Sequence, residues 1–155
     1  MDKMDAMNDH TLPSPDADGA LDFCLRLARA QALIVRRFDS ALGNLHGLSF
    51  SDYQLLYQLQ RAPGARLRRI DLAERLALTA SGVTRSLMPL EKIGLVARQA
   101  DARDARVGYA VLTAAGQELL GHASATAQAV GRELLQDAPA EQLGALSALL
   151  GRLAG

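Results

Sequence analysis

Residues 79–92, TASGVTRSLMPLEK, combine two patterns on one predicted helix. Val83, Leu87 and Leu90 recur at helical spacing and predict the buried face. A second face, near the N-terminal end, carries side chains that can contact DNA: Ser81, Thr84, Arg85 and Met88. An arginine can make a bidentate contact with guanine, and hydroxyl groups can contact bases or phosphates. The segment therefore predicts a DNA-recognition helix, with ordinary helix capping as the alternative role of Ser81 and Thr84.

The segments around this helix predict a winged helix-turn-helix. A short helix is expected before it, at about residues 67–78, and Arg68 and Arg69 at its start suit phosphate contacts or solvent. After Gly94, which ends the recognition helix, residues 95–99 and 107–112 are strand-like around a charged turn. In such a fold the second helix enters the major groove. The apolar residues expected to face inward from the short helix are Ile70, Ala73 and Leu76.

The charge of the chain is unevenly distributed. Between Arg61 and Arg106, ten arginine and lysine residues stand against five acidic residues, a net charge of +5 in a chain whose total is zero. The remaining residues carry the compensating negative charge. A basic centre with acidic arms is typical of nucleic-acid contact, and a solvated charged face is the alternative.

The first half of the chain predicts a tail and two helices. Residues 1–19 are polar and contain two prolines, so they predict a disordered tail. A helical apolar stripe follows from Leu21 to about Leu45. The segment Ser51–Gln54 is interpreted as a capping box that opens a second helix, which Pro63 and Gly64 end.

Two further helices are expected after the wing. Thr113 is predicted to cap a helix from Ala114 to about Leu135, and Pro139 to start the last one. The last helix carries leucines on one face and has no later segment of chain to pack against. This pattern predicts an intermolecular partner for the last helix.

Composition limits the class of protein. A chain of 155 residues suits one domain, and 49% apolar with 22% charged residues is typical of a soluble globular protein. No apolar run approaches the ~18–20 residues of a membrane span, and the N-terminal residues do not resemble a secretory signal. The single cysteine, Cys24, excludes an intrachain disulfide and favours a reducing cytoplasm.

Two stretches give the chain a specific resemblance. Ile70–Val96, IDLAERLALTASGVTRSLMPLEKIGLV, and Asp101–Thr113, DARDARVGYAVLT, closely resemble the MarR family, the multiple antibiotic resistance regulators. The Asp-x-Arg-Asp-x-Arg wing is the most diagnostic part. The resemblance implies a mainly helical fold with a small β-hairpin wing, and a homodimeric bacterial transcription factor on palindromic double-stranded DNA.

The resemblance also implies an organisation of the chain. A family-type domain is expected over 20–155, with the winged helix-turn-helix lobe at 50–113 and dimerisation helices at 20–46 and 114–155. The matching positions imply Ser81, Thr84 and Arg85 in the major groove and Arg103, at the wing tip, in the minor groove. An inserted guanidinium suits the electronegative minor groove of A·T-rich DNA. Charge pairing that braces the wing is implied for Asp101, Asp104 and Arg106.

The resemblance leaves two ways in which such a regulator could leave DNA. The family binds small phenolic or aromatic acids between its dimerisation helices and DNA-binding lobe, where a pocket could be lined by Arg37, His46, Tyr53 and Tyr57. Another branch senses peroxides through a cysteine at the position of Cys24, with tyrosines around it. The corresponding residues here donate no such hydrogen bonds, which favours a buried structural cysteine.

The sequence gives no pattern for catalysis or a cofactor. His10, His46 and His122 are too scattered for a metal site, and no nucleophile elbow, phosphate-binding loop or zinc-protease motif occurs. We therefore expect a transcriptional regulator, most often a repressor. The rival class is a winged-helix module for protein–protein assembly, which needs neither a base-contacting arginine nor a basic wing.

Overall fold

The computed structural model describes residues 15–155, so the predicted tail lies outside the described residues up to position 14. From Pro15 the chain is already helical, and the prediction of a tail up to residue 19 is wrong for its last five residues. Proline suits the first turn of a helix because its fixed φ is helical and it needs no N–H partner there. The chain divides at Ile34 into two compact units, and the core described below belongs to the second unit.

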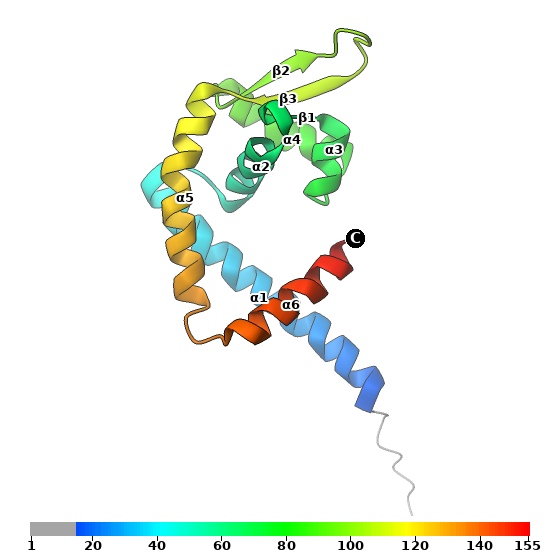
Figure 1. Ribbon diagram of the computed structural model, residues 1–155, viewed down its shortest axis with the longest axis vertical. Coiled ribbons are helices and arrows are strands. Elements are labelled where there is room, and N and C mark those ends of the chain that lie inside the picture. Colours follow the sequence, from blue (N-terminus) through cyan, green and yellow to red (C-terminus); the bar gives the residue numbers. More distant parts are fainter. Residues whose placement is uncertain (1–14) are drawn as a thin grey trace, which may run out of the picture. The chain divides into compact units, whose positions relative to one another are not determined.

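Helices make up most of the described chain (Figure 1). The predicted fold class, mainly helical with a small β wing, is confirmed. The elements are α1 (Pro15–His46), α2 (Phe50–Arg61), a 3-10 turn (Pro63–Ala65), β1 (Arg66–Arg68), α3 (Arg69–Arg75), α4 (Ala80–Lys92), β2 (Val96–Ala100), β3 (Gly108–Leu112), α5 (Ala114–Leu134) and α6 (Ala140–Ala154).

The core is built of leucine, valine and alanine side chains. α2 packs against α5 and against β3, and α3 packs against α4. The predicted inner face of the recognition helix is confirmed, because Val83, Leu87 and Leu90 are buried. The least exposed large side chains of the described residues are Leu42, Leu48, Leu55, Leu56, Leu59, Leu72, Val83, Leu87, Leu90, Val96 and Leu120.

The wing contains a strand that was not predicted. β1 pairs with β3, so the antiparallel sheet has the order β1-β3-β2 instead of being a two-stranded hairpin. The expected helical start at Leu67 is therefore wrong. Arg66 and Arg68 are exposed and Leu67 is buried opposite Ala110, which is the alternation of a strand with one face on the core.

The short helix α3 presents a different face from the one expected. Ile70 is 71% exposed, whereas Leu72 is fully buried, and Ala73 and Leu76 face the core as predicted. Residues 70 and 72 are both compatible with a helical stripe through Ala73 and Leu76. The helix α3 has only seven residues and directly follows β1, so we infer that β1 determines which face of α3 is buried.

The helix α2 begins two residues earlier than the predicted capping box. Ser49 is the N-cap, and its hydroxyl accepts a hydrogen bond from the Asp52 backbone N–H at 3.0 Å. The Asp52 carboxylate in turn accepts from the Ser49 backbone N–H at 3.1 Å. An aspartate at the third helical position thus fulfils the role that glutamate or glutamine has in the usual motif. Ser51 lies inside the helix.

The start of α5 requires a residue without a side chain. Thr113 caps the helix as predicted, and a Cβ built on Gly116 would lie 2.2 Å from the Leu95 carbonyl oxygen. That oxygen also accepts a hydrogen bond from the Thr113 backbone N–H, so it is held in place. The close approach of α5 to the segment before β2 therefore depends on glycine.

Replacing Gly116 by alanine is expected to destabilise the protein by about 2–4 kcal/mol, since a held backbone atom must move. Chemical denaturation measures the change in the free energy of unfolding. The control is Gly121→Ala in the same helix, where nothing lies within 4 Å of the added Cβ. This control should be neutral or gain up to about 1 kcal/mol from helix propensity. Equal stability of the two variants would contradict the close approach.

No helix in residues 15–155 is long and apolar enough to cross a membrane.

Candidate nucleic-acid interface

The recognition helix α4 is defined by local capping at both ends. The Thr79 hydroxyl accepts from the Gly82 backbone N–H at 3.1 Å, and Gly94 follows the helix with a φ of +80°. With three apolar residues buried, the outer face is left to polar and mixed side chains. Ser81, Arg85 and Met88 are exposed on it.

Thr84 differs from the other residues predicted to contact bases. Its side chain is half-buried, and its hydroxyl donates a hydrogen bond to the Ala80 carbonyl oxygen at 3.1 Å. The Thr84 hydroxyl oxygen itself accepts a hydrogen bond from Arg69 Nη2 at 2.8 Å. The donor and one acceptor position of this hydroxyl are therefore used within the protein.

The arginine at the end of β1 is also paired within the protein. Arg68 donates from Nε and Nη2 to the two carboxylate oxygens of Asp71, at 2.7 and 3.0 Å. These hydrogen bonds, together with the charge of Asp71, raise the pKa of Arg68 above its ordinary value. The bidentate pair holds the guanidinium at the start of α3.

The wing tip is organised by two aspartates. One oxygen of Asp101 accepts from the backbone N–H groups of Arg103 and Asp104, at 2.7 and 3.2 Å. Its other oxygen accepts from the Tyr109 hydroxyl at 3.3 Å. Asp104 pairs with Arg106, at 3.1 Å between Oδ1 and Nε. Asp101 therefore acts mainly through backbone amides, whereas Asp104 and Arg106 form the kind of charge pair that the resemblance implies.

These contacts make the wing sensitive to acid. Backbone hydrogen bonds from Arg103 and Asp104 hold the pKa of Asp101 below its usual value of 3.8, and Arg106 does the same for the pKa of Asp104. A carboxyl whose pKa is lowered by folding stabilises the folded form above its unfolded pKa, and this contribution disappears as the pH falls through the folded pKa.

We expect the wing tip to loosen below about pH 4, before the leucine core unfolds. The amide NMR signals of Arg103 and Asp104 should follow this transition. In Asp101→Asn the same signals should indicate a less ordered wing tip. The acid transition that Asp101 causes should be absent, because the asparagine side chain does not titrate. Wing signals that change in the parent protein at neutral pH would contradict the assignment.

Of the arginines predicted to contact DNA, two make no side-chain hydrogen bond or ion pair within the described residues. These are Arg85 on α4 and Arg103 at the wing tip, both exposed. By contrast, Arg68, Arg69, Arg98 and Arg106 are each paired with an acidic side chain. The guanidinium groups of Arg85 and Arg103 therefore have their donors available for another molecule.

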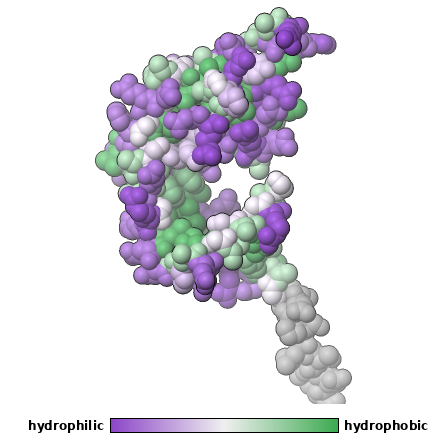
Figure 2. All heavy atoms as spheres, viewed as in Figure 1, coloured by the Kyte–Doolittle hydropathy of each residue, from purple (hydrophilic) through white to green (hydrophobic). Residues whose placement is uncertain are grey.

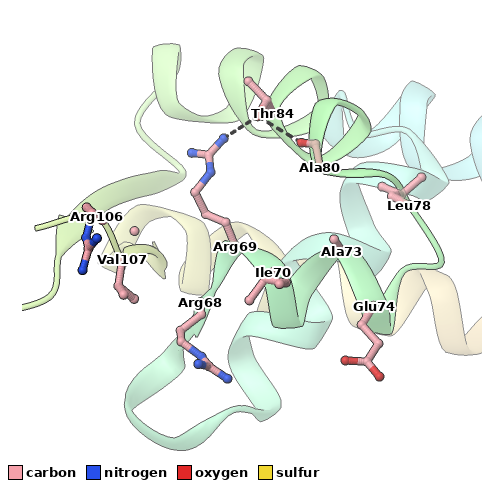
Figure 3. Close-up of a pocket in the computed structure, with 11 residues that line it drawn as sticks. Arg68, Arg69, Ile70, Ala73, Glu74, Leu78, Ala80, Thr84, Arg106 and Val107 are labelled. Atoms are coloured by element: carbon pink, nitrogen blue, oxygen red, sulfur yellow. Dashed lines mark hydrogen bonds between the residues drawn. The ribbon is translucent and has the colours of Figure 1, made fainter. Parts of the chain in front are cut away.

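A cavity of about 680 Å³ shows that α4 and the wing share one face (Figure 3). Its walls come from α3, from the N-terminal half of α4 and from the base of the wing. Hydrophilic residues cover much of the wing in the surface view (Figure 2). The cavity is lined by Arg68, Arg69, Ile70, Ala73, Glu74, Leu78, Ala80, Thr84, Arg106, Val107 and Gly108.

The four residues predicted to line an effector pocket lie elsewhere, on α1 and α2. Three of them bond to α5: Arg37 forms an ion pair with Glu133, His46 Nε2 is 2.8 Å from Thr126 Oγ1, and the Tyr53 hydroxyl is 3.1 Å from Ser124 Oγ. Tyr57 stacks on Tyr53, with 6.0 Å between ring centroids. The cavity described above contains none of these residues, and a pocket among them remains a prediction.

The remaining candidates divide between the two units of the chain. Cys24 is exposed, so the interpretation as a buried structural cysteine is wrong for the single chain. The unit that contains it has no buried side chain among its described residues. No group of three His, Cys, Asp or Glu side chains that could hold a metal ion occurs in the described part of the chain, and His10 lies outside that part.

Sequence reasoning gave no role to several polar residues that contact one another on this face. Glu91 on α4 accepts hydrogen bonds from Arg98 on β2, at 3.2 and 3.3 Å. Arg66 donates to Gln99 Oε1 at 2.8 Å and lies over the Tyr109 ring at 4.7 Å from its centroid. The alternation of Arg66, Leu67 and Arg68 was the available signal for β1. No local pattern marks Glu91, since its partners come from other elements.

Known proteins resemble this chain over nearly its whole length. A model of the MarR family matches residues 46–107. Sco3205, a MarR family transcriptional regulator from Streptomyces coelicolor solved in complex with DNA, is 27% identical with a TM-score of 0.81, over 89% of this chain and 86% of that one. BldR, a transcriptional regulator from Sulfolobus solfataricus, is 27% identical with a TM-score of 0.79, over 90% and 99%. No curated protein matches.

A third structure agrees with these. AbsC, another MarR family transcriptional regulator from Streptomyces coelicolor, is 27% identical with a TM-score of 0.78, over 91% of this chain and 93% of that one. The matched family and these structures are transcriptional regulators and not enzymes. With α3 and α4 followed by the β2–β3 wing, the chain has the winged helix-turn-helix fold of MarR family transcriptional regulators, and its residues 46–107 match the model of that family.

Proposed function

We propose that this regulator is a homodimeric repressor that binds a palindromic operator and leaves it when a small phenolic or aromatic acid binds. The observation that carries the DNA-binding part is the pair Arg85 and Arg103. They are exposed arginines of α4 and the wing whose guanidinium groups make no hydrogen bond or ion pair within residues 15–155. Sco3205, which is similar over most of its length, was solved with DNA.

Each part of the face has its own role in this proposal. Arg85 contacts a guanine edge in the major groove, with Ser81 beside it on the exposed face of α4. Arg103 enters the adjacent minor groove, whose potential is most negative in A·T-rich DNA. The paired arginines Arg68 and Arg106 line the cavity between α3 and the wing and add positive charge near the phosphates.

The homodimer is supported by apolar side chains that the single chain leaves exposed. In α6 no residue is buried, and Leu146 and Leu153 are 45% and 63% exposed. In the N-terminal unit, Leu21 and Leu25 are likewise more than half exposed. Contiguous apolar faces of this kind favour a partner surface. A second copy places two recognition helices in two-fold symmetry, which suits a palindrome.

The proposed effector site lies where α1 and α2 meet α5. Arg37, His46 and Tyr53 supply a cation and polar ring atoms, and Tyr57 adds a second stacked ring. A carboxylate and an aromatic ring are the groups that such side chains bind best. A bound acid would compete with the bonds to Glu133, Thr126 and Ser124 on α5, and so would move α5 relative to the DNA-binding lobe.

Recovery of the DNA fragments that the purified protein retains tests the proposal. The expected result is a palindromic sequence, bound with an affinity that falls steeply as salt increases, because arginines displace counterions from phosphates. A protein–protein module would retain no preferred sequence. Addition of aromatic acids should then release the fragment. Release by peroxide in the parent but not in Cys24→Ser would instead assign the thiol as the sensor.

A further inference from the structure

Arg69 lies on the face proposed to contact DNA, yet its side chain is directed into the protein. It is the first residue of α3, and its side chain is only 23% exposed. Nη2 donates to Thr84 Oγ1 at 2.8 Å, and Nη1 lies 3.6 Å from Glu91 Oε1. Figure 3 shows the side chain extending from α3 towards α4 and ending at Thr84. A side chain in this position has few donors left for a phosphate.

The partners of Arg69 lie on one face of α4. Thr84 and Glu91 are seven residues apart, which is two helical turns, so one guanidinium spans the middle of the recognition helix. Glu91 is only 20% exposed, and it also accepts hydrogen bonds from Arg98 on β2. The carboxylate thus joins α3, α4 and the wing through two arginines.

The wing leaves room for this contact. Gly108, the first residue of β3, lies beneath the Arg69 stem, and a Cβ added there would be 3.2 Å from Arg69 Cδ. Such a distance is too short for an ordinary carbon–carbon contact. Arg69 therefore crosses the base of the wing at a glycine to reach α4.

We propose that Arg69 is a positioning residue that fixes the recognition helix relative to the wing, through Thr84 and Glu91, and is not a phosphate ligand. The proposal rests on the proposed DNA-binding function and refines it. Arg85 on α4 and Arg103 on the wing must meet adjacent grooves of one duplex, so their spacing has to be held. A planar guanidinium can bond to two groups at fixed angles, whereas an ammonium cannot reproduce that geometry. The hydroxyl of Thr84, which Arg69 engages, keeps one acceptor position.

The variant Arg69→Lys separates the two roles because it keeps the charge and loses the fork. If Arg69 is a positioning residue, lysine should not replace it, and operator binding by Arg69→Lys should weaken about tenfold at every salt concentration. The dependence of log affinity on log salt should keep the slope of the parent, both in Arg69→Lys and in the neutral Arg69→Met. A lost phosphate contact would lower the slope of Arg69→Met by about one per protomer.

Glu91→Gln provides the reciprocal test. If Glu91 holds Arg69, this variant should weaken binding, and the double variant with Arg69→Met should bind no worse than the weaker single variant. The matched control is Glu74→Gln, which removes a carboxylate that lines the same cavity but makes no ion pair within the described residues. That control should bind DNA as well as the parent or slightly better.

Three results overturn the proposal: parent-like binding by Arg69→Lys, a reduced salt slope in Arg69→Met, or additive effects of the Arg69 and Glu91 variants. Unfolding measurements on the same variants test the contact without DNA. In the double-variant cycle, the unfolding constant of the double variant should differ by at least about threefold from the value expected if the two substitutions acted independently. If the parent binds no DNA, the proposed function fails, while this cycle still decides whether Arg69 and Glu91 act together.

Discussion

Deletion of residues 140–155 is expected to leave a chain that is monomeric or insoluble. The deletion removes all of α6, which has no buried residue in the single chain and carries Leu146 and Leu153 on its surface. Complete burial of a leucine is worth about 1.5–3 kcal/mol, so several such residues in a two-fold interface supply most of its stability. Without them the remaining apolar surface stays in contact with water.

Light scattering after size-exclusion chromatography measures the mass of the truncated chain. Since a truncated chain can also fail to fold, the full-length variant Leu146→Glu with Leu153→Glu tests the same face. The control is Ser147→Glu, at another exposed position of α6. The leucine variant should dissociate while its circular dichroism remains helical, and the control should stay dimeric. A stable dimer of the truncated chain would refute the assignment of α6.

Replacement of Arg85 by alanine is expected to cost about 1–3 kcal/mol of binding free energy per half-site and to relax the base preference at one operator position. Arg85 is exposed on α4 and makes no side-chain hydrogen bond or ion pair within residues 15–155, so alanine removes contacts to DNA without unpairing another residue. Arg103→Ala should act differently. It should weaken binding through the flanking A·T-rich minor groove and leave the central base preference nearly unchanged.

Competition between operator variants at one fixed salt concentration measures both effects. Lys92→Ala is the matched control, since it removes a positive charge at the other end of the same helix. It should lower affinity slightly for all sequences and change no base preference. Parent-like binding by both arginine variants would mean that this face does not contact the operator.

The recognition helix could be predicted from the sequence because its signals are local. Thr79 and Gly94 bound the helix, and Val83, Leu87 and Leu90 show its buried face at helical spacing. The same holds for the cap of α5 at Thr113. Capping and amphipathic periodicity act between residues within one or two turns, so they can be recognised in a short window of sequence.

Short segments were determined by packing instead. Arg66–Arg68 is a strand because β3, more than forty residues later, offers it a pairing edge at Tyr109–Val111. That pairing sets the direction in which α3 starts, so that Leu72 is buried and Ile70 is exposed. For segments of three and seven residues, local propensity is weaker than the tertiary contacts that they make.

The face proposed to contact DNA divides in the same way. The sequence by itself determined which residue types stand on α4 and on the wing, and Arg85 and Arg103 follow from that pattern. Only the tertiary structure decided which arginines are already paired, because Glu91 meets Arg69 and Arg98 across three separate elements. A side-chain pair of this kind depends on distances between elements and leaves no periodic signal along the chain.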